Sequence, residues 1–329
     1  MSVTMISSAH SFRLPNEHRQ GLDVGHNNKY GIVYGFLALA DIIDKIEEMD
    51  RQSSQDRSPE KRGRTMRRWT FTLGLAVVLL LFPSVAAAQS PEEKGFIIVR
   101  EADKRDSGFS DFTANMQMIL MNKQDQKSER KIRIRTLEVK EDGDKSLIIF
   151  DTPRDIKGTA FLSFTHKVGD DDQWLYLPAL KRIKRISSRN KSGSFMGSEF
   201  SYEDIASQEV EKYTYKWIRD ERYEGRECFV LEKCPVDRKN SGYTKQVIWL
   251  DKKEYRVWKA EYFDRKNFHL KTLTSTDYQK YLNQYWRPDR MYMVNHQTGK
   301  STNLIMSNYK FRTGLKESDF NKNNLRRIR

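Results

Sequence analysis

The chain has 329 residues, of which 37% are hydrophobic and 12% aromatic, and its formal net charge is +14. This apolar content is enough for a packed core, which excludes a chain that is disordered throughout. The excess of positive charge points to an anionic partner, either nucleic acid or a membrane surface.

A secretory signal is predicted at residues 66–88. Arg67 and Arg68 precede an apolar run at 69–82, and three alanines end the segment at Ala88. This layout is typical of a bacterial signal peptide, and the apolar run is shorter than the roughly 20 residues of a membrane-spanning helix. We therefore expect cleavage near Ala88 and release into the periplasm.

The position of this signal decides how the rest of the chain is divided. Secretory signals stand at the N-terminus, so residues 1–65 are interpreted as an extension from a start codon placed too far upstream, either disordered or with an isolated helix at 30–49. The exported domain is expected at 89–329, which holds 48 Lys and Arg and 36 Asp and Glu, a formal net charge of +12. Because an exported protein meets no genome, nucleic acid is excluded, and lipid head groups or an acidic protein surface become the expected partners.

The first element of the exported domain is predicted to be a helix at residues 91–106. Ser90 can cap its N-terminus, Pro91 suits the first turn, and Glu92 and Glu93 favour the positive end of the helix dipole. The helix presents one modest apolar face. It is therefore a candidate to cover whatever apolar surface the rest of the domain forms.

Strands are predicted for most of the chain that follows. Alternation places Met116, Met118 and Leu120 on one face of a strand, and Ile132 and Ile134 on one face of the next. About eleven short strands joined by polar turns indicate a mainly β domain with one antiparallel sheet. A sheet of that length must curl, because strands twist. We expect an incomplete antiparallel β-barrel, covered by the N-terminal helix and by a lid loop or helix at 192–205.

The most informative segment is WLYLPALKRIKRISSRNKSGSFMGSEFSYEDI, at residues 174–205. It begins as a strand that Pro178 ends, continues as a basic run, and then enters a Ser/Gly-rich loop that carries Phe195 and Met196. Large apolar side chains in such a loop need an apolar place to go. They either fill the protein's own core or form a movable flap over an apolar cavity.

This segment resembles the signature block of the LolA-like outer-membrane lipoprotein-sorting proteins of Gram-negative bacteria. The resemblance extends from about Glu93 to the C-terminus and is to the broader LolA-like group. It implies an incomplete β-barrel with helices and loops as a lid, whose apolar hollow takes acyl chains. It also implies that Leu315 and Phe320, in the closing segment, pack back on the sheet.

A carrier of acyl chains needs an apolar hollow, a lid that yields and a docking surface, and the sequence offers candidates for each. The alternative to a hollow is a barrel core filled by the same apolar side chains. The candidates are Met116, Met118, Leu120, Ile132, Ile134, Phe161, Trp174 and Tyr176 for the cavity lining, Phe195 and Met196 for the lid, and Lys181, Arg182, Lys184 and Arg185 for contacts with head groups or a partner protein.

Catalytic and metal-binding motifs are missing from the sequence. Neither G-x-S-x-G nor H-E-x-x-H occurs, and the three histidines of the exported domain are scattered. The pair Glu203-Asp204 and the run 170–172 are interpreted as solvated loop charges, with Asp204 as an alternative helix cap. Cys228 and Cys234 lie too far apart along one strand for a disulfide. We expect no enzyme activity, no cofactor, no metal and two free thiols.

Two functions remain open. The first is a monomeric periplasmic carrier or chaperone that binds the acyl chains of lipoproteins or lipids and delivers them towards an outer-membrane acceptor. The alternative is an accessory periplasmic subunit that docks on an inner-membrane transporter of the resistance-nodulation-division type and carries no cargo.

Overall fold

In the part of the chain that the structure describes, thirteen antiparallel strands form one continuous sheet in the order β6-β5-β4-β3-β2-β1-β13-β12-β11-β10-β9-β8-β7. The computed structural model describes residues 89–327, which belong to one unit, Ala87–Arg329. The expected upstream extension and secretory signal lie outside the described residues. The strands are β1 (Asp111–Met121), β2 (Lys127–Leu137), β3 (Lys145–Thr152), β4 (Ala160–Phe164), β5 (Asp172–Leu177), β6 (Arg182–Ile186), β7 (Tyr213–Tyr223), β8 (Arg226–Pro235), β9 (Tyr243–Asp251), β10 (Val257–Asp264), β11 (His269–Tyr281), β12 (Tyr285–Asn295) and β13 (Ser301–Phe311).

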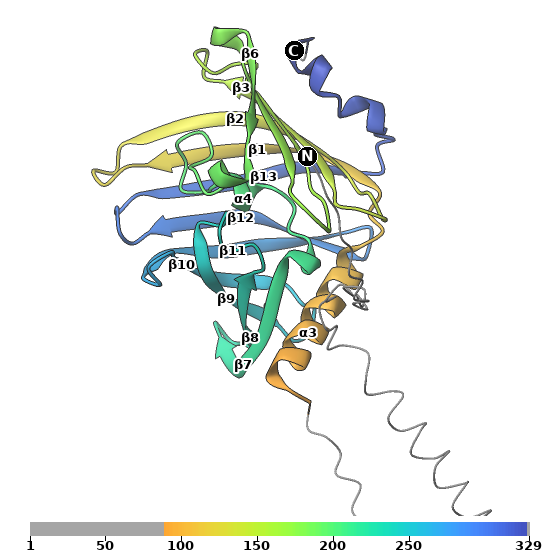
Figure 1. Cartoon of the computed structure of the whole chain (residues 1–329), viewed down its shortest axis with the longest axis vertical. Helices are drawn as coiled ribbons and strands as arrows, with labels where there is room; N and C mark the ends of the chain where they lie inside the picture. The colour runs from red at the N-terminus through yellow and green to blue at the C-terminus, as the bar shows by residue number, and fades with distance from the viewer. Residues whose placement is uncertain (1–88, 328–329) are drawn as a thin grey trace, which may run out of the picture. The chain divides into compact units, whose positions relative to one another are not determined.

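The chain enters the sheet at its middle and leaves it at the same place. Strands β1 to β6 step outward to one edge, whereas β7 to β13 step inward from the opposite edge, so that β13 pairs with β1 and Met306 lies opposite Met116. The sheet curves strongly between its ends (Figure 1), and the described strands form no ladder between β6 and β7. This is the expected incomplete barrel, with thirteen strands instead of about eleven.

The basic run of the informative segment is itself a strand, which the sequence did not predict. Among the described strands, β6 pairs only with β5, and Arg185 lies opposite Trp174. A short, charged strand is typical of a sheet edge, because charge discourages pairing with another chain. The basic residues of β6 therefore have a structural role at the edge in addition to any role in docking.

Helix α3 (Pro91–Asp106) confirms the predicted N-terminal helix. The Ser90 hydroxyl accepts a hydrogen bond from the Glu93 backbone N–H at 3.0 Å, as the cap requires. Gly95 packs directly on β7: a Cβ at this position would lie 2.8 Å from the backbone nitrogen of Trp217. Only glycine allows this approach, which fixes α3 against one end of the curved sheet (Figure 1).

Short helical segments complete the fold. Four 3₁₀ turns and helix α4 stand between strands or near the C-terminus: η1 (Pro178–Leu180), η2 (Ser188–Asn190), α4 (Tyr202–Ile205), η3 (Val210–Lys212) and η4 (Glu317–Asp319), with the longer 3₁₀ segment η5 (Lys322–Arg327) last. The connection at 187–212, which holds η2, α4 and η3, runs from one edge of the sheet to the other. It contains the predicted lid.

Both faces of β3, β4 and β5 are buried, by different parts of the chain. The concave face carries the main core, which α3 and the 187–212 connection cover. On the outer face, Phe320 and Leu325 of the closing segment pack against Leu147 and Leu162, with Leu315 at the margin. The packing expected for Leu315 and Phe320 is confirmed.

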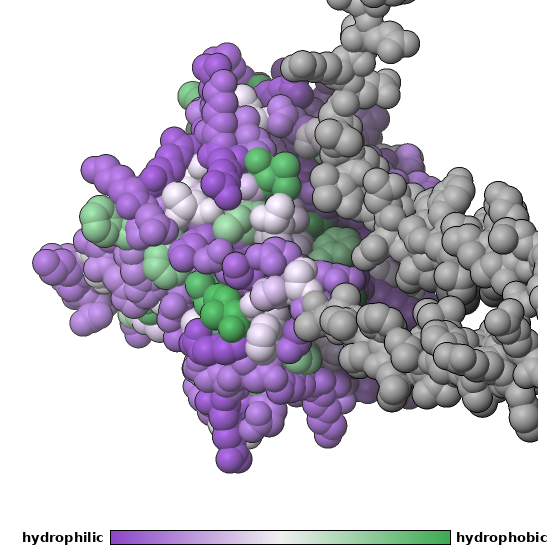
Figure 2. All heavy atoms as spheres, turned by 60° about the horizontal axis from the view of Figure 1, so that its bottom comes forward, coloured by the Kyte–Doolittle hydropathy of each residue, from purple (hydrophilic) through white to green (hydrophobic). Residues whose placement is uncertain are grey.

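Three further features of the described residues concern the cysteines, the helices and the surface. Cys228 and Cys234 both lie on β8 and are free thiols. None of the helices described at 89–327 has the length and apolar character needed to cross a membrane. The face shown in Figure 2 is mostly hydrophilic, and its apolar residues form small separate patches.

Candidate functional site

A cavity of about 600 Å³ lies between α3 and the concave face of the sheet. Its volume is within the range of small-molecule sites, roughly 300–1,000 Å³. The helix contributes Val99 and Ala102, and the sheet contributes apolar side chains from both of its halves. The apolar sheet residues of the wall include Phe112, Met116, Ile134, Ile148, Ile248, Leu250, Val257, Met291, Leu304 and Met306.

The predicted lining residues divide into three groups. Met116 and Ile134 face the cavity. Four others belong to the same concave core without lining the cavity: Met118, Leu120, Ile132 and Phe161. Trp174 and Tyr176 lie on the opposite face of the sheet, in the cluster that the closing segment covers.

The prediction that Trp174 and Tyr176 line the inner face of the sheet was wrong, because both side chains lie on the outer face. Leu175, between them, is the residue that points into the concave core. It pairs with Phe161 of β4, whereas Trp174 pairs with Leu162 on the outer face. Because both faces of β5 are buried, the apolar pattern does not reveal which face is which.

Phe195, from the predicted lid, is fully buried in the concave core. Its ring centroid lies 5.9 Å from that of Phe150, 5.3 Å from that of Phe161 and 5.4 Å from that of Tyr202. Met196 next to it is half-buried with a φ of +52°, and its carbonyl accepts a hydrogen bond from the Arg130 guanidinium. The lid loop thus fills one part of the hollow, and the cavity occupies another.

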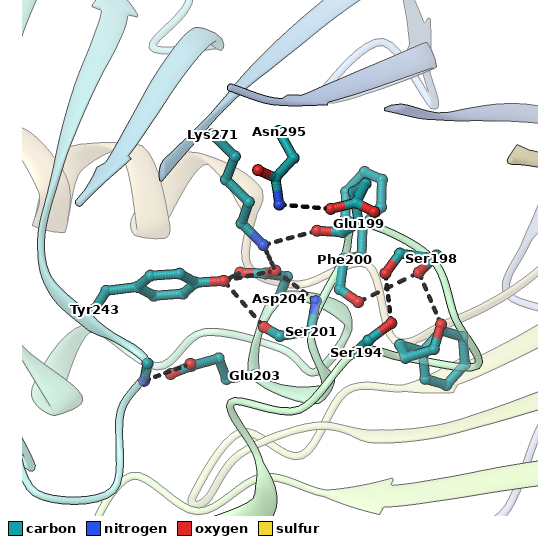
Figure 3. A network of polar contacts seen from close by, with 12 residues as sticks. Ser194, Ser198, Glu199, Phe200, Ser201, Glu203, Asp204, Tyr243, Lys271 and Asn295 are labelled. Carbon is teal, nitrogen blue, oxygen red and sulfur yellow. Dashed lines mark hydrogen bonds and ion pairs between the residues drawn. The ribbon is translucent and has the colours of Figure 1, made fainter. Parts of the chain in front are cut away.

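A buried polar network ties the lid to the sheet (Figure 3). The Lys271 ammonium, on β11, lies 2.6 Å from Oδ2 of Asp204 and donates to the Glu199 carbonyl at 2.8 Å. The Tyr243 hydroxyl, on β9, donates to the same carboxylate at 2.9 Å. Burial raises the pKa of Tyr243, and the negative charge of Asp204 adds to this effect. Two strands therefore hold one acidic residue of α4.

Glu203, the other acidic residue of α4, and Glu199, in the loop before this helix, are also held by hydrogen bonds. Oε1 of Glu203 accepts the Gly242 backbone N–H at 2.8 Å, and burial raises the pKa of Glu203. Glu199 accepts a hydrogen bond from the Asn295 side chain at 2.7 Å. The interpretation of Glu203 and Asp204 as solvated loop charges was wrong. The alternative prediction of Asp204 as a helix cap was also displaced, because Ser201 is the N-cap of α4 and Asp204, at the third helical position, accepts the Ser201 backbone N–H in a capping box.

Comparison with known proteins places the whole domain in a family. A family model described as "Uncharacterized protein" matches residues 142–327, which are 186 of the 329 residues. The crystal structure of a domain from Vibrio parahaemolyticus, described as an outer-membrane lipoprotein-sorting protein domain, is 59% identical with a TM-score of 0.70, and the match covers 71% of this chain and 99% of that one. The chain belongs to the LolA-like family of outer-membrane lipoprotein-sorting proteins.

Two further solved structures are similar to this LolA-like chain. A DUF1329 family protein from Desulfovibrio piger is 30% identical with a TM-score of 0.68, and the match covers 72% of this chain and 99% of that one. A LolA superfamily protein from Nitrosomonas europaea is 22% identical with a TM-score of 0.57, covers 69% of this chain and 97% of its own, and shares the fold. The search of curated proteins gave no match.

One end of the cavity in the LolA-like domain is polar. The Ser207 hydroxyl donates to Oδ2 of Asp144 at 3.4 Å, and the next residue, Gln208, accepts a hydrogen bond from the buried Lys233 ammonium. Burial and the charge of Glu209 raise the pKa of Asp144 to about 7, and burial lowers the pKa of Lys233 to about 7. The sequence analysis did not predict this polar end, because its side chains come from three separate segments of the chain.

The predicted docking residues lie on the surface of the LolA-like domain. Arg182, Lys184 and Arg185 are exposed on β6, and exposed Lys181 precedes them with a φ of +47°. Arg185 lies 2.6 Å from the carboxylate of Asp172. A contact with head groups or a partner remains a prediction for this edge. Within residues 89–327, no group of three or more His, Cys, Asp or Glu side chains is arranged to hold a metal ion.

Proposed function

We propose that this LolA-like protein is a periplasmic carrier that binds acyl chains of lipoproteins or lipids and moves them towards the outer membrane. The observation that carries the proposal is the cavity of about 600 Å³ between α3 and the concave sheet, with apolar residues from both halves of the sheet on its wall. The predicted secretory signal supports the compartment, and the family supports the class of cargo.

The walls of the cavity suit acyl chains energetically. Each CH₂ group moved from water to an apolar site contributes roughly 0.8 kcal/mol. Met116, Met291 and Met306 contribute flexible side chains to the wall, and methionine adapts to irregular apolar shapes. A cavity of this kind can accept chains of different lengths without a rigid fit.

Release of the cargo needs a cover that moves, and the two covers differ in how firmly they are held. The lid loop is fixed by the buried contacts of Asp204 and Glu199, so its displacement costs polar as well as apolar contacts. Helix α3 is held by the close approach at Gly95, by apolar packing of Ile98 on the main core, and by exposed ion pairs such as Arg100 with Glu211 at 3.1 Å, without a buried ion pair like that of the lid. Exposed pairs contribute little. We infer that α3 moves more readily than the lid loop.

The proposal is tested by filling the cavity from the helix. Ala102 lines the cavity on α3, whereas Lys104 is exposed on the same helix. Protein with Ala102→Trp, protein with Lys104→Trp and the wild type are purified from the envelope fraction, and their bound lipids are extracted and identified by mass spectrometry. We expect acyl species with the wild type and Lys104→Trp, and a loss of them with Ala102→Trp at an unchanged circular dichroism spectrum.

The same experiment can overturn the proposal. If the wild type carries no acyl species, or if Ala102→Trp retains them in full, the cavity does not hold cargo. Capture of an inner-membrane transporter by the cargo-free protein would then support the accessory-subunit alternative.

A further inference from the structure

A second pocket, of about 450 Å³, adjoins the cavity. Ala206, Ser207 and Gln208 line both spaces, so this short stretch of the 187–212 connection is the partition between them. The partition side chains are held by few bonds: Ser207 to Asp144 at 3.4 Å and Gln208 to Lys233. A small local displacement of these residues would join the two spaces.

The second pocket lies where the sheet is open. Its wall includes Ile186 at the end of β6 and Tyr213 at the start of β7, which are the two edges of the sheet. Val168 and Val236 also line it and are 86% and 62% exposed, so they stand at its mouth. A molecule can therefore reach the partition from outside through the gap between the edges.

The wall of this pocket carries charges of both signs. Lys212 forms an ion pair with Asp171, and Lys191 lies 3.6 Å from Asp237. In all, three lysines and five acidic residues line the pocket: Lys167, Lys191, Lys212, Asp170, Asp171, Glu203, Glu211 and Asp237. A group with a net negative charge is disfavoured by the excess of carboxylates, whereas a group that carries both charges finds partners for each.

One buried amide nitrogen in this wall has no hydrogen-bond partner among the residues at 89–327. Gln173 of β5 is 2% exposed, lines the pocket, and its Nε2 has no hydrogen-bond partner among the described residues. Ser163, directly opposite on β4, is fully buried and its Oγ is also without a partner in the described part of the chain. A buried amide without a partner costs free energy, and the Nε2 group is a donor, so it calls for an acceptor oxygen.

We propose that the cargo is an intact zwitterionic phospholipid, whose acyl chains lie in the large cavity and whose phosphate and amine occupy the second pocket, with Gln173 donating to a head-group oxygen. This proposal rests on the proposed carrier function and narrows its cargo. A free fatty acid leaves the second pocket unused, and an anionic phospholipid brings a net negative charge to a wall rich in carboxylates.

The test measures the affinity of the purified chain for four probes by displacement of a fluorescent fatty acid. The probes are a phosphatidylethanolamine, a phosphatidylglycerol with the same acyl chains, oleate, and a triacylated lipopeptide. We expect the phosphatidylethanolamine to bind about tenfold more tightly than the others, since one satisfied buried group is worth about one factor of ten. Gln173→Leu should remove this preference and leave oleate binding unchanged, whereas Gln124→Leu, in an exposed turn, should change neither.

The outcomes separate this inference from the carrier function. If oleate, phosphatidylglycerol or the lipopeptide binds as tightly as the phosphatidylethanolamine, the head-group site is overturned and the carrier function stands. A preference that survives in folded Gln173→Leu also overturns it. If no probe binds, both proposals fail. The ranking of the probes by the wild type does not depend on whether the variant folds.

Discussion

Lys271 of β11 and Asp204 of α4 form an ion pair inside the domain, with 2.6 Å between Nζ and Oδ2 and side-chain exposures of 4% and 2%. The two residues belong to segments that are far apart in sequence, and their contact joins the lid to the sheet (Figure 3). A lid that is anchored in this way has a defined closed position, which sets the shape of the space left for a ligand.

Removing one partner of this pair should be costly. Lys271→Met leaves the Asp204 carboxylate buried without its counter-charge, and we expect the free energy of unfolding to fall by about 3–5 kcal/mol. The matched control is Arg290→Met on β12, whose pair with Asp277 is about half exposed. That change should cost less than about 1 kcal/mol. Urea denaturation of both variants checks the prediction, and equal costs would contradict it.

The fully buried Phe195 should act as a core residue as well as a lid residue. Phe195→Ala removes three aromatic contacts and leaves a void, so we expect a loss of about 3–5 kcal/mol in the free energy of unfolding. Phe268→Ala is the control, because Phe268 stands in a turn and is 64% exposed. If thermal unfolding shows the two variants to be equally stable, Phe195 is not packed as described.

The polar end of the cavity should make stability depend on pH in two opposite ways. Between pH 3.8 and about 7, Asp144 binds more protons in the folded state than in the unfolded chain, so the free energy of unfolding falls as the pH rises. Between about 7 and 10.5, Lys233 binds more protons in the unfolded chain, so the free energy of unfolding rises with pH. The plot of the free energy of unfolding against pH therefore has a falling limb due to Asp144 and a rising limb due to Lys233. Each limb has a slope of at most about 1.4 kcal/mol per pH unit.

Two variants separate these limbs. Asp144→Asn should remove the falling limb alone, and Lys233→Met should remove the rising limb alone. The check is the free energy of unfolding of wild type and variants in urea from pH 4 to 10, compared as differences at each pH. A variant that shifts the whole curve without changing its slope would contradict the assignment of that limb.

The close approach of α3 to β7 predicts that replacing Gly95 by alanine lowers the free energy of unfolding, the opposite of the usual effect in a helix. Gly→Ala inside an exposed helix usually stabilises by about 1 kcal/mol. At Gly95 the added Cβ meets the backbone of β7, and overpacking typically costs about 1–3 kcal/mol, so we expect Gly95→Ala to destabilise the domain. Lys104→Ala, on the exposed side of α3, should have almost no effect. Thermal unfolding of both variants decides, and a stabilised Gly95→Ala would contradict the contact.

Local signals in the sequence were enough for a large part of the fold. The Ser90 cap and the alternation of Met116 and Met118 depend on neighbouring residues, and both predictions are confirmed. By contrast, the faces of β5 depend on what covers them, and the closing segment that buries Trp174 lies more than a hundred residues away. Parity within one strand cannot resolve that choice.

The candidate site was less predictable than the fold, because its polar groups meet only through tertiary contacts. The capping box of Ser201 and Asp204 is local in sequence, but Lys271, the buried ion-pair partner of Asp204, is 67 residues further on. Lys233 stands in an alternating strand like many surface lysines. It lies on the same face of β8 as Leu231, which is the concave face, and its ammonium donates to the partition residue Gln208.

The gap between β6 and β7 has a mechanical consequence. In a closed barrel, admitting a bulkier guest means stretching or breaking a ladder of main-chain hydrogen bonds, which acts against the whole circumference at once. Here the circumference is interrupted, and side-chain pairs such as Lys191 with Asp237 span the interruption. A separation of β6 from β7 would break side-chain contacts such as this pair and leave the hydrogen-bonded strand pairs intact.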